Sequence, residues 1–268
     1  RSHIGFVPAE EIVTHRIIWS CLFLILLVWW TKTGRQVLEV FQHLRYLALL
    51  TLTALLIAAN WLLFIWAINH DHMLESSLGY FINPLLNILL GMLFLGETLR
   101  RWQWLAVALA VSGVMLQIIT LGVFPWIALS LASSFAVYGL IRKKIAVDSL
   151  TGLLVETVML TPLAAWYLFF HADTATSHLS QNPLALNLWL LAAGIITTVP
   201  LLCFTAGAKR LRLSTIGFFQ YLGPSLMFIF AITLYHEPIV WQKWLTFALI
   251  WSALGLFSWD ALRHNRQN

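Results

Sequence analysis

Residues 46–69 read YLALLTLTALLIAANWLLFIWAIN, and none of them is charged. The hydrocarbon core of a bilayer is about 30 Å thick, and a helix needs roughly 20 apolar residues to cross it. This run is therefore long enough to span a membrane as one helix. It also holds an amide, Asn60, next to Trp61 and well inside the apolar stretch.

The whole chain shares the character of this run. Of its 268 residues, 60% are hydrophobic and 10% are charged, whereas soluble domains average about 25% charged residues. An ordinary soluble domain and a disordered chain are both excluded by this composition. The net charge of +5 does not indicate a nucleic-acid partner, because the basic residues punctuate apolar runs and do not cluster on one water-facing surface.

Eight further runs of spanning length flank the first one. The nine runs cover residues 11–31, 46–69, 77–95, 102–121, 124–141, 150–170, 187–208, 215–235 and 242–260. The connections between them are short, the longest being 32–45 and 171–186, and none could fold as a separate soluble domain. The predicted fold class is an all-α polytopic membrane protein.

The charges of the connections predict the orientation of the chain. One alternating set of connections, which includes Arg142, Lys143 and Lys144, carries thirteen Lys and Arg against four carboxylates, whereas the other set carries two against six. Cytoplasmic connections of membrane proteins are enriched in Lys and Arg. We therefore expect a multi-pass protein of the bacterial inner membrane with a cytoplasmic C-terminus and residue 1 on the periplasmic side.

An internal repeat predicts how the helices are organised. A shift of 140 residues places Pro84, Glu97, Trp104 and Ser112 on Pro224, Glu237, Trp244 and Ser252. We interpret this as a duplication, with residues 1–121 as a first repeat that lacks its first helix and 122–268 as a complete second repeat. Five helices per repeat make the two repeats antiparallel, so the family architecture has ten helices, of which nine are present here. In transporters built this way, the binding site lies near the bilayer midplane between the repeats.

Two ionisable residues fall inside predicted spans, where such groups are costly and often functional. Arg16, which follows His15, lies about five residues inside the first run, and Glu156 occupies the equivalent place in the second repeat. Arg16 could dock an anionic or zwitterionic solute, and Glu156, with His15, could carry a proton or a charge. Alternatively, both charges lie close enough to the helix ends to reach water and simply hold helices together.

Polar amides and aromatic rings form a second set of candidate site residues. Asn83 and Asn87 are four residues apart and share one helix face, with Tyr80 on the same face. The remaining members of the proposed substrate-binding set, besides Arg16, are Asn60, Trp61, Gln220 and Tyr221. An amide in hydrocarbon needs a hydrogen-bond partner, which can be a neighbouring helix or a ligand.

Prolines and carboxylates occupy equivalent places in the two repeats. Pro84 and Pro224 each remove a backbone hydrogen bond early in a span, which makes them either hinges beside a cavity or static kinks. Glu97 and Glu237 each lie between two runs. A carboxylate at a helix N-terminus accepts bonds from free N–H groups, so capping is the preferred role and an ion gate the alternative.

Signatures of an enzyme or a metalloprotein are weak or absent in the sequence. The His-Asp-His triplet at residues 70–72 has no further ligand at a fixed spacing. Two cysteines in apolar runs build neither a disulfide framework nor a zinc site. Because no catalytic or nucleotide-binding motif is present, we expect no enzyme activity, no cofactor and no metal.

Five segments together resemble the RarD branch of the EamA family, within the drug/metabolite transporter superfamily. They are NWLLFIWA at 60–67, SLGYFINP at 77–84, Gly96-Glu97, RKKIAV at 142–147 and LSTIGFFQ at 213–220. The resemblance covers the whole chain. It implies ten transmembrane helices in two inverted EamA repeats, residence in the bacterial inner membrane and a link to chloramphenicol sensitivity, but it names no substrate.

The leading functional hypothesis is a secondary transporter that moves a small metabolite or drug-like solute by alternating access. Trp61, Trp66, Tyr80, Phe81, Phe219 and Tyr221 would form apolar walls, the amides would orient the solute and Arg16 would supply charge. The alternative is a non-transporting membrane scaffold or accessory subunit, and an intramembrane enzyme is a third reading. The expected partners are a small molecule and the lipid bilayer; a homodimer stays open.

Overall fold

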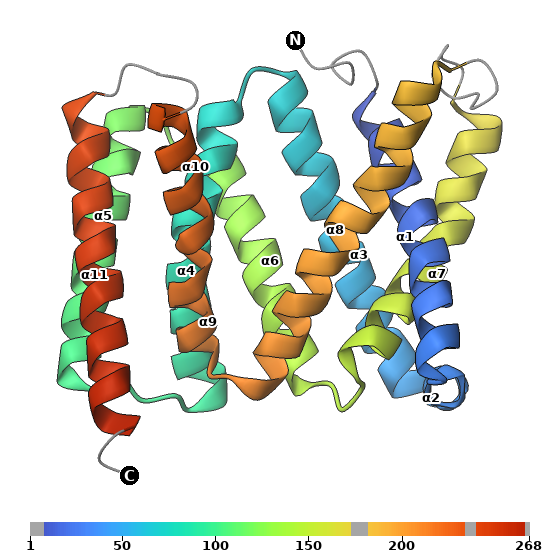
Figure 1. Ribbon diagram of the computed structural model, residues 1–268, viewed down its shortest axis with the longest axis horizontal. Coiled ribbons are helices and arrows are strands. Elements are labelled where there is room, and N and C mark those ends of the chain that lie inside the picture. Colours follow the sequence, from blue (N-terminus) through green and yellow to red (C-terminus); the bar gives the residue numbers. More distant parts are fainter. Residues whose placement is uncertain (1–7, 173–181, 234–239, 266–268) are drawn as a thin grey trace. The chain divides into compact units, whose positions relative to one another are not determined.

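A computed structural model describes residues 8–172, 182–233 and 240–265 (Figure 1). Over these residues the chain forms helices and no strand. The helices are α1 (Ala9–Thr31), α2 (Gly34–Phe41), α3 (Leu44–Asn69), α4 (Met73–Leu95), α5 (Arg101–Leu121), α6 (Trp126–Lys144), α7 (Ser149–Phe170), α8 (Leu184–Arg210), α9 (Leu213–Gln220), α10 (Leu222–Thr233) and α11 (Trp241–Asn265). The predicted all-α fold class is confirmed.

The predicted runs coincide with the long helices. Within the described residues, eight helical segments are long and apolar enough to cross a membrane. The run at 124–141 forms α6, which stays outside that set because its last turn consists of Arg142, Lys143 and Lys144. The protein is thus a multi-pass membrane protein.

Two local features were not predicted, although the run at 215–235 is borne out as a candidate span over Leu213–Phe230. The connection 32–45 contains helix α2, which is too short to span a membrane and was missed because only long apolar runs were sought. It is stabilised by an i,i+4 ion pair between Arg35 and Glu39, 3.3 Å apart, and Val40 is buried. The run at 215–235 is interrupted at Tyr221 and forms α9 and α10. Pro224 has no N–H to donate to the Gln220 carbonyl, so the regular bonding pattern stops there.

The chain divides into two compact units. Unit 1 comprises the described parts of Arg1–His70 and Ile141–Arg210, and unit 2 those of Asp71–Leu140 and Leu211–Asn268. Unit 1 therefore contains α1, α2, α3, α7 and α8, and unit 2 contains α4, α5, α9, α10 and α11. Helix α6 contributes its first part to unit 2 and its last turn to unit 1.

The helix starts recur with the same shift of 140 residues that relates the sequence segments. The pairs of first residues are Ala9 and Ser149, Leu44 and Leu184, Met73 and Leu213, and Arg101 and Trp241. Each compact unit thus holds matching helices from both halves of the chain. The compact units are defined by contacts in space, whereas the repeats are defined by similarity along the sequence. The repeat boundary at residue 121 therefore stays a prediction.

Small residues allow the matching helices to approach closely. In unit 2, α5 packs on α11 through Ala106, Ala110, Ile250 and Ala253, all fully buried. Helix α4 packs on α9, where a Cβ on Gly217 would lie only 2.6 Å from the Pro84 carbonyl oxygen. Close backbone approach of this kind is a common basis of helix association in membranes.

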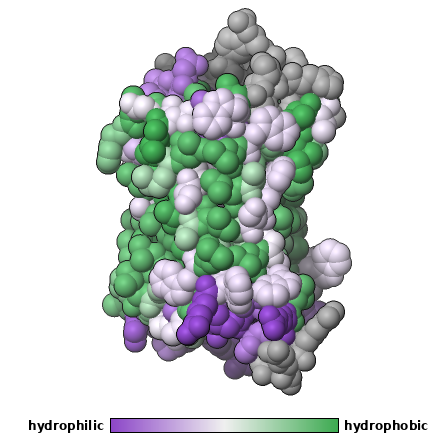
Figure 2. Space-filling view, turned by 90° about the vertical axis from the view of Figure 1, so that its left-hand side faces the viewer, coloured by the Kyte–Doolittle hydropathy of each residue, from purple (hydrophilic) through white to green (hydrophobic). Residues whose placement is uncertain are grey.

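The surface of unit 2 matches a membrane environment. Figure 2 shows the side of the molecule on which α5 and α11 lie: hydrophobic side chains cover its middle and hydrophilic ones gather mainly at its lower end. Exposed tryptophans lie near both ends of α11, with Trp241 65% and Trp259 46% exposed. Tryptophan at these positions is typical of the membrane interface.

Candidate functional site

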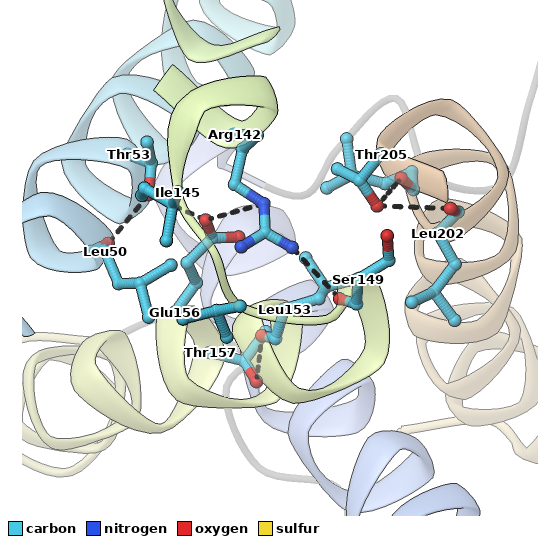
Figure 3. A network of polar contacts seen from close by, with 12 residues as sticks. Leu50, Thr53, Arg142, Ile145, Ser149, Leu153, Glu156, Thr157, Leu202 and Thr205 are labelled. Carbon is cyan, nitrogen blue, oxygen red and sulfur yellow. Dashed lines mark hydrogen bonds and ion pairs between the residues drawn. The ribbon is translucent and has the colours of Figure 1, made fainter. Parts of the chain in front are cut away.

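Unit 1 contains a buried ion pair that joins two consecutive helices. Arg142, in the last turn of α6, and Glu156, on α7, are 0% and 1% exposed. Arg142 Nε lies 3.5 Å from Glu156 Oε1, and Arg142 Nη2 donates to the Ser149 carbonyl at 3.0 Å. The Thr53 hydroxyl, on α3, donates to the same Glu156 oxygen at 2.6 Å (Figure 3). Three helices thus meet at one carboxylate.

A glycine makes room for this buried guanidinium. A Cβ on Gly152 would lie 1.9 Å from Arg142 Nη1 and 2.6 Å from its Cζ. Gly152 and Glu156 are four residues apart, so they share one face of α7. The glycine leaves the space that the Arg142 side chain fills beside its carboxylate partner.

Lysine side chains link the same end of α6 to α8 by hydrogen bonds. Lys143 Nζ donates to the Ala208 carbonyl at 2.8 Å, and Lys209 Nζ donates to the carbonyls of Ile145, at 3.2 Å, and Val147. Lysine ammonium groups near a helix C-terminus stabilise its last carbonyls in this way.

The sequence did not identify Arg142. It was counted with Lys143 and Lys144 among the charges of a water-facing connection, whereas the structure buries it completely. A buried carboxylate such as Glu156 requires a cation, and three adjacent basic residues lie one short loop away. The available signal was Gly152, whose missing side chain lies on the face that carries Glu156.

Arg16 lies elsewhere in unit 1, on α1. Its guanidinium carbon is 4.7 Å from the centre of the Trp61 ring, and its Nε donates to Thr197 Oγ1 at 2.9 Å. A cation over an indole face is stabilised by the ring quadrupole. The neighbouring His15 is 2% exposed, and its Nε2 has no hydrogen-bond partner among the described residues. The structure therefore brings together Arg16 and Trp61, two members of the predicted set.

The amides of α4 form the corresponding polar group in unit 2. Asn87 is fully buried, and its Nδ2 donates to Gln220 Oε1 at 2.6 Å. Asn83, one turn earlier, is also buried. The Oδ1 atoms of Asn83 and Asn87 have no hydrogen-bond partner within the part of the chain that the structure describes. Two unsatisfied acceptors thus lie on one face of α4.

The predicted aromatic residues occupy different environments. Tyr221 is fully buried and donates its hydroxyl hydrogen to the Phe81 carbonyl at 3.1 Å, which ties the α9–α10 junction to α4. Tyr80 is 41% exposed. Asn60, on α3 of unit 1, is half-buried and precedes Trp61. The predicted site residues therefore belong to both units.

The two prolines behave differently. Helix α4 continues through Pro84, whereas α9 ends four residues before Pro224. Their role as hinges stays a prediction.

The prediction that Glu97 caps a helix is confirmed. The helix that it caps is not α5, which follows it in the chain, but one much later in the sequence. Its Oε1 accepts from the Leu213 N–H at 2.6 Å, and its Oε2 accepts from the Ser214 N–H and hydroxyl at 2.9 and 2.7 Å. Glu97 therefore caps α9. A Cβ on Gly91 would meet Glu97 Oε2 at 2.7 Å, so this glycine makes space for the cap. Glu237 lies outside the described residues.

Metal binding gains no support from the geometry. Among the described residues, no three or more His, Cys, Asp and Glu side chains group closely enough to hold a metal ion. Among the predicted site residues, the structure brings together Arg16 with Trp61 in unit 1 and Asn87 with Gln220 in unit 2.

Comparisons with known proteins agree on one family. The model of the EamA-like transporter family matches residues 2–119. Protein RarD of Salmonella typhi is 60% identical over 264 residues, which cover 98% of this chain and 90% of that protein. The chloramphenicol-sensitive protein RarD of Pseudomonas aeruginosa is 32% identical over 259 residues, 94% of this chain and 85% of its own.

A solved structure supports the fold. One protein crystal structure matches 94% of this chain and 88% of its own chain with a TM-score of 0.70 and 19% identity. At that identity the likeness concerns the fold alone.

Proposed function

Because the chain belongs to the RarD branch of the EamA-like transporter family, we propose that it is a secondary transporter that carries a small metabolite or drug-like solute by alternating access. Its role as a membrane transporter follows from the family itself. We further propose that it resides in the bacterial inner membrane with its C-terminus in the cytoplasm, since its connections carry the charge asymmetry of such proteins.

The observation that carries this proposal is the pair of buried amide oxygens on α4. A buried acceptor without a donor costs about 1–3 kcal/mol, and Asn83 and Asn87 each leave one such oxygen in unit 2. A solute with hydroxyl or amide N–H groups would supply the missing donors. The amides would then orient the solute, as a few placed polar groups do in most small-molecule sites.

Arg16, which lies in unit 1, is the charged member of the proposed set of substrate-binding residues. Arg16 contacts Trp61 and Thr197 and is not buried completely, and we propose that its positive charge attracts an anionic group of the solute. Pro84 and the α9–α10 junction would supply the flexibility for alternating access, since both places lack a regular helical bond.

Transport by proteoliposomes tests the role of the amides. Radiolabelled chloramphenicol is a suitable probe, because a relative is named for sensitivity to it and the molecule carries hydroxyl and amide donors. We expect Asn83→Leu to raise the KM at least about tenfold while the free energy of unfolding stays equal or rises, because the change removes an unsatisfied acceptor. Asn69→Leu, at an exposed amide at the end of α3, is the matched control and should leave both quantities unchanged.

Two outcomes would contradict the proposal. Wild-type KM in the Asn83→Leu variant would show that this amide does not contact the solute. If the wild-type protein moved neither chloramphenicol nor any other small donor-bearing solute across the bilayer, a scaffold or accessory subunit would become the better description.

Glu156 could in principle couple transport to protons, but we propose a structural role for it instead. Protonation of Glu156 would leave the Arg142 charge buried without its counter-ion, at a cost of about 3–5 kcal/mol. We therefore expect Glu156→Gln to lower the stability in detergent but to preserve any dependence of transport on pH. A loss of that dependence in a folded Glu156→Gln variant would assign the proton to this carboxylate.

A further inference from the structure

Unit 2 contains a cavity at the end where α4 and α11 begin and α5 ends. Its volume is about 410 Å³, within the range typical of small-molecule sites. The cavity is lined by Leu74, Ser77, Leu78, Tyr80, Phe81, Gln117, Thr120, Leu121, Pro224, Met227, Phe228, Val240, Gln242, Lys243 and Phe247. Tyr80, Phe81 and Pro224 belong to the residues discussed above.

Two adjacent residues of α11 give the cavity its polarity. The Gln242 Oε1 is buried, yet it has no hydrogen-bond partner among the described residues. Lys243, half-buried in the first turn of α11, adds a positive charge, and the N-terminal end of a helix also favours an anion. One acceptor and one cation are thus available at the same wall.

Packed aromatic rings form much of the remaining lining, beside the polar side chains of Ser77, Gln117 and Thr120. Phe228 stacks on Phe247 with ring centres 3.8 Å apart, and Phe81 meets Phe247 edge to face at 5.6 Å. Gln117 is fixed, since its Nε2 donates to Thr246 Oγ1 at 3.1 Å. A flat apolar body would fit against these rings.

A second cavity, of about 240 Å³, lies at the opposite end of α5 and α11. Several of its lining residues are the repeat counterparts of residues that line the larger cavity. Under the shift of 140, the linings correspond in the pairs Arg100 and Val240, Gln103 and Lys243, Phe257 and Gln117, and Ala261 and Leu121. Beside the smaller cavity, Arg100 Nε donates to Asp260 Oδ2 at 2.7 Å, and the Arg100 N–H donates to Gln103 Oε1 at 3.0 Å. Arg212, Thr215 and His264 also line this cavity.

The larger cavity lacks this internal pairing. The counterparts of Arg100 and Asp260 are Val240 and Thr120, which form no ion pair. Among the described residues that line the larger cavity, the charged side chain is Lys243, and the matching residue of the smaller cavity is Gln103, which is neutral. Matching positions therefore carry the Arg100–Asp260 ion pair at one end of unit 2, whereas at the other end the buried Gln242 Oε1 has no hydrogen-bond partner within the described part of the chain.

We propose that the larger cavity binds a small amphipathic anion that also carries an O–H or N–H donor. Lys243 would bind the anionic group, and the Gln242 Oε1 would accept a hydrogen bond from the O–H or N–H group. The phenylalanine rings would cover the apolar body. This site goes beyond the proposed function, because it requires unit 2 alone and is tested by binding without transport.

Equilibrium binding to the purified full chain in detergent tests the proposal with three related probes. The probe p-coumarate has a carboxylate, a phenolic O–H and an aromatic body; cinnamate lacks the O–H, and p-coumaramide lacks the charge. A hydrogen bond to a charged group contributes about 1.5–3 kcal/mol, or roughly 10- to 100-fold in affinity. We expect p-coumarate to bind at least about tenfold more tightly than p-coumaramide and several-fold more tightly than cinnamate.

The variants assign each preference to one residue. Lys243→Met should abolish the preference for p-coumarate over p-coumaramide, and Gln242→Leu the preference for p-coumarate over cinnamate. Lys32→Met and Gln36→Leu make the same chemical changes in unit 1 and should alter neither preference.

Two results would overturn the proposal. One is wild-type protein that binds the three probes equally or not at all at millimolar concentration. The other is a Lys243→Met variant, folded by circular dichroism, that keeps the preference for the anion. If Gln242→Leu failed to fold, the comparison of p-coumarate with cinnamate on wild-type protein would still decide whether the donor is recognised.

Discussion

The substitution Gly152→Ala tests whether the Arg142–Glu156 pair holds unit 1 together. The new Cβ would lie 1.9 Å from Arg142 Nη1 and 2.6 Å from Cζ, far inside van der Waals contact. Since Arg142 is 0% exposed, its guanidinium has no open space into which to retreat. It must either push α6 and α7 apart or leave the carboxylate.

The magnitude follows from three terms. Alanine gains about 1 kcal/mol over glycine in a helix interior, whereas overpacking costs about 1–3 kcal/mol. Separation of the charges adds about 3–5 kcal/mol, the cost of leaving one buried charge without its partner. If the pair survives, the first two terms nearly cancel, and if it breaks, the loss reaches at least about 3 kcal/mol. We expect the second result.

The free energy of unfolding, measured by titration of detergent micelles with a denaturing surfactant, distinguishes these results. Gly255→Ala is the matched control, because it lies within α11 with no atom within 4 Å of the added Cβ, and it should be neutral or slightly stabilising. In an Arg142→Met and Glu156→Met background, Gly152→Ala should change the free energy of unfolding little, because the overpacking cost and the gain of alanine in a helix nearly cancel. A single Gly152→Ala variant as stable as the wild type would show that the ion pair survives beside the new Cβ, and would refute the expected separation of Arg142 from Glu156.

Three further predictions concern single contacts. Glu97→Gln should lower the free energy of unfolding by about 1–3 kcal/mol, since an amide keeps one acceptor oxygen against the start of α9 and loses its charge. Gly217→Ala should lower the free energy of unfolding by at least about 1–3 kcal/mol, because its Cβ would lie 2.6 Å from the Pro84 carbonyl oxygen. Gly223→Ala is the control, since its Cβ would meet nothing within 4 Å, and it should not lower the stability. Arg16→Lys should raise the KM for chloramphenicol about tenfold at unchanged kcat, because an ammonium lacks the planar fork of donors; an unchanged KM would exclude Arg16 from the site.

The spans could be predicted from the sequence because a bilayer imposes a rule on length that acts along the chain. Any uninterrupted apolar run of about 20 residues satisfies it, whatever its neighbours are. Helix α2 does not obey that rule, since eight residues are stabilised by local pairs and by the burial of Val40. The interruption at Tyr221 has a local signal, Pro224, but Pro84 carries the same signal and α4 continues through it.

Partners across the chain could not be predicted in the same way. Glu97 reads as a helix cap, yet the helix that it caps begins at Leu213. Glu156 reads as a buried charge in need of a cation, but the sequence does not say which cation reaches it. Such contacts depend on how helices cross, and crossing is set by the sum of many packing interactions rather than by one motif. Only the small residue beside the site, Gly152, marks the contact in the sequence.

The shift of 140 residues links these findings, because related positions carry different chemistry in the two halves of the chain. Arg16 matches Glu156, and Gln103 matches Lys243. A position that forms an internal pair contributes to stability and leaves its charge inaccessible, whereas a charge without such a pair costs stability unless a ligand compensates it. Natural proteins concentrate such costs at functional sites. By this reasoning the Arg100–Asp260 end of unit 2 serves stability, and the Lys243 end, where the matching pair is absent, is the end that recognises a ligand.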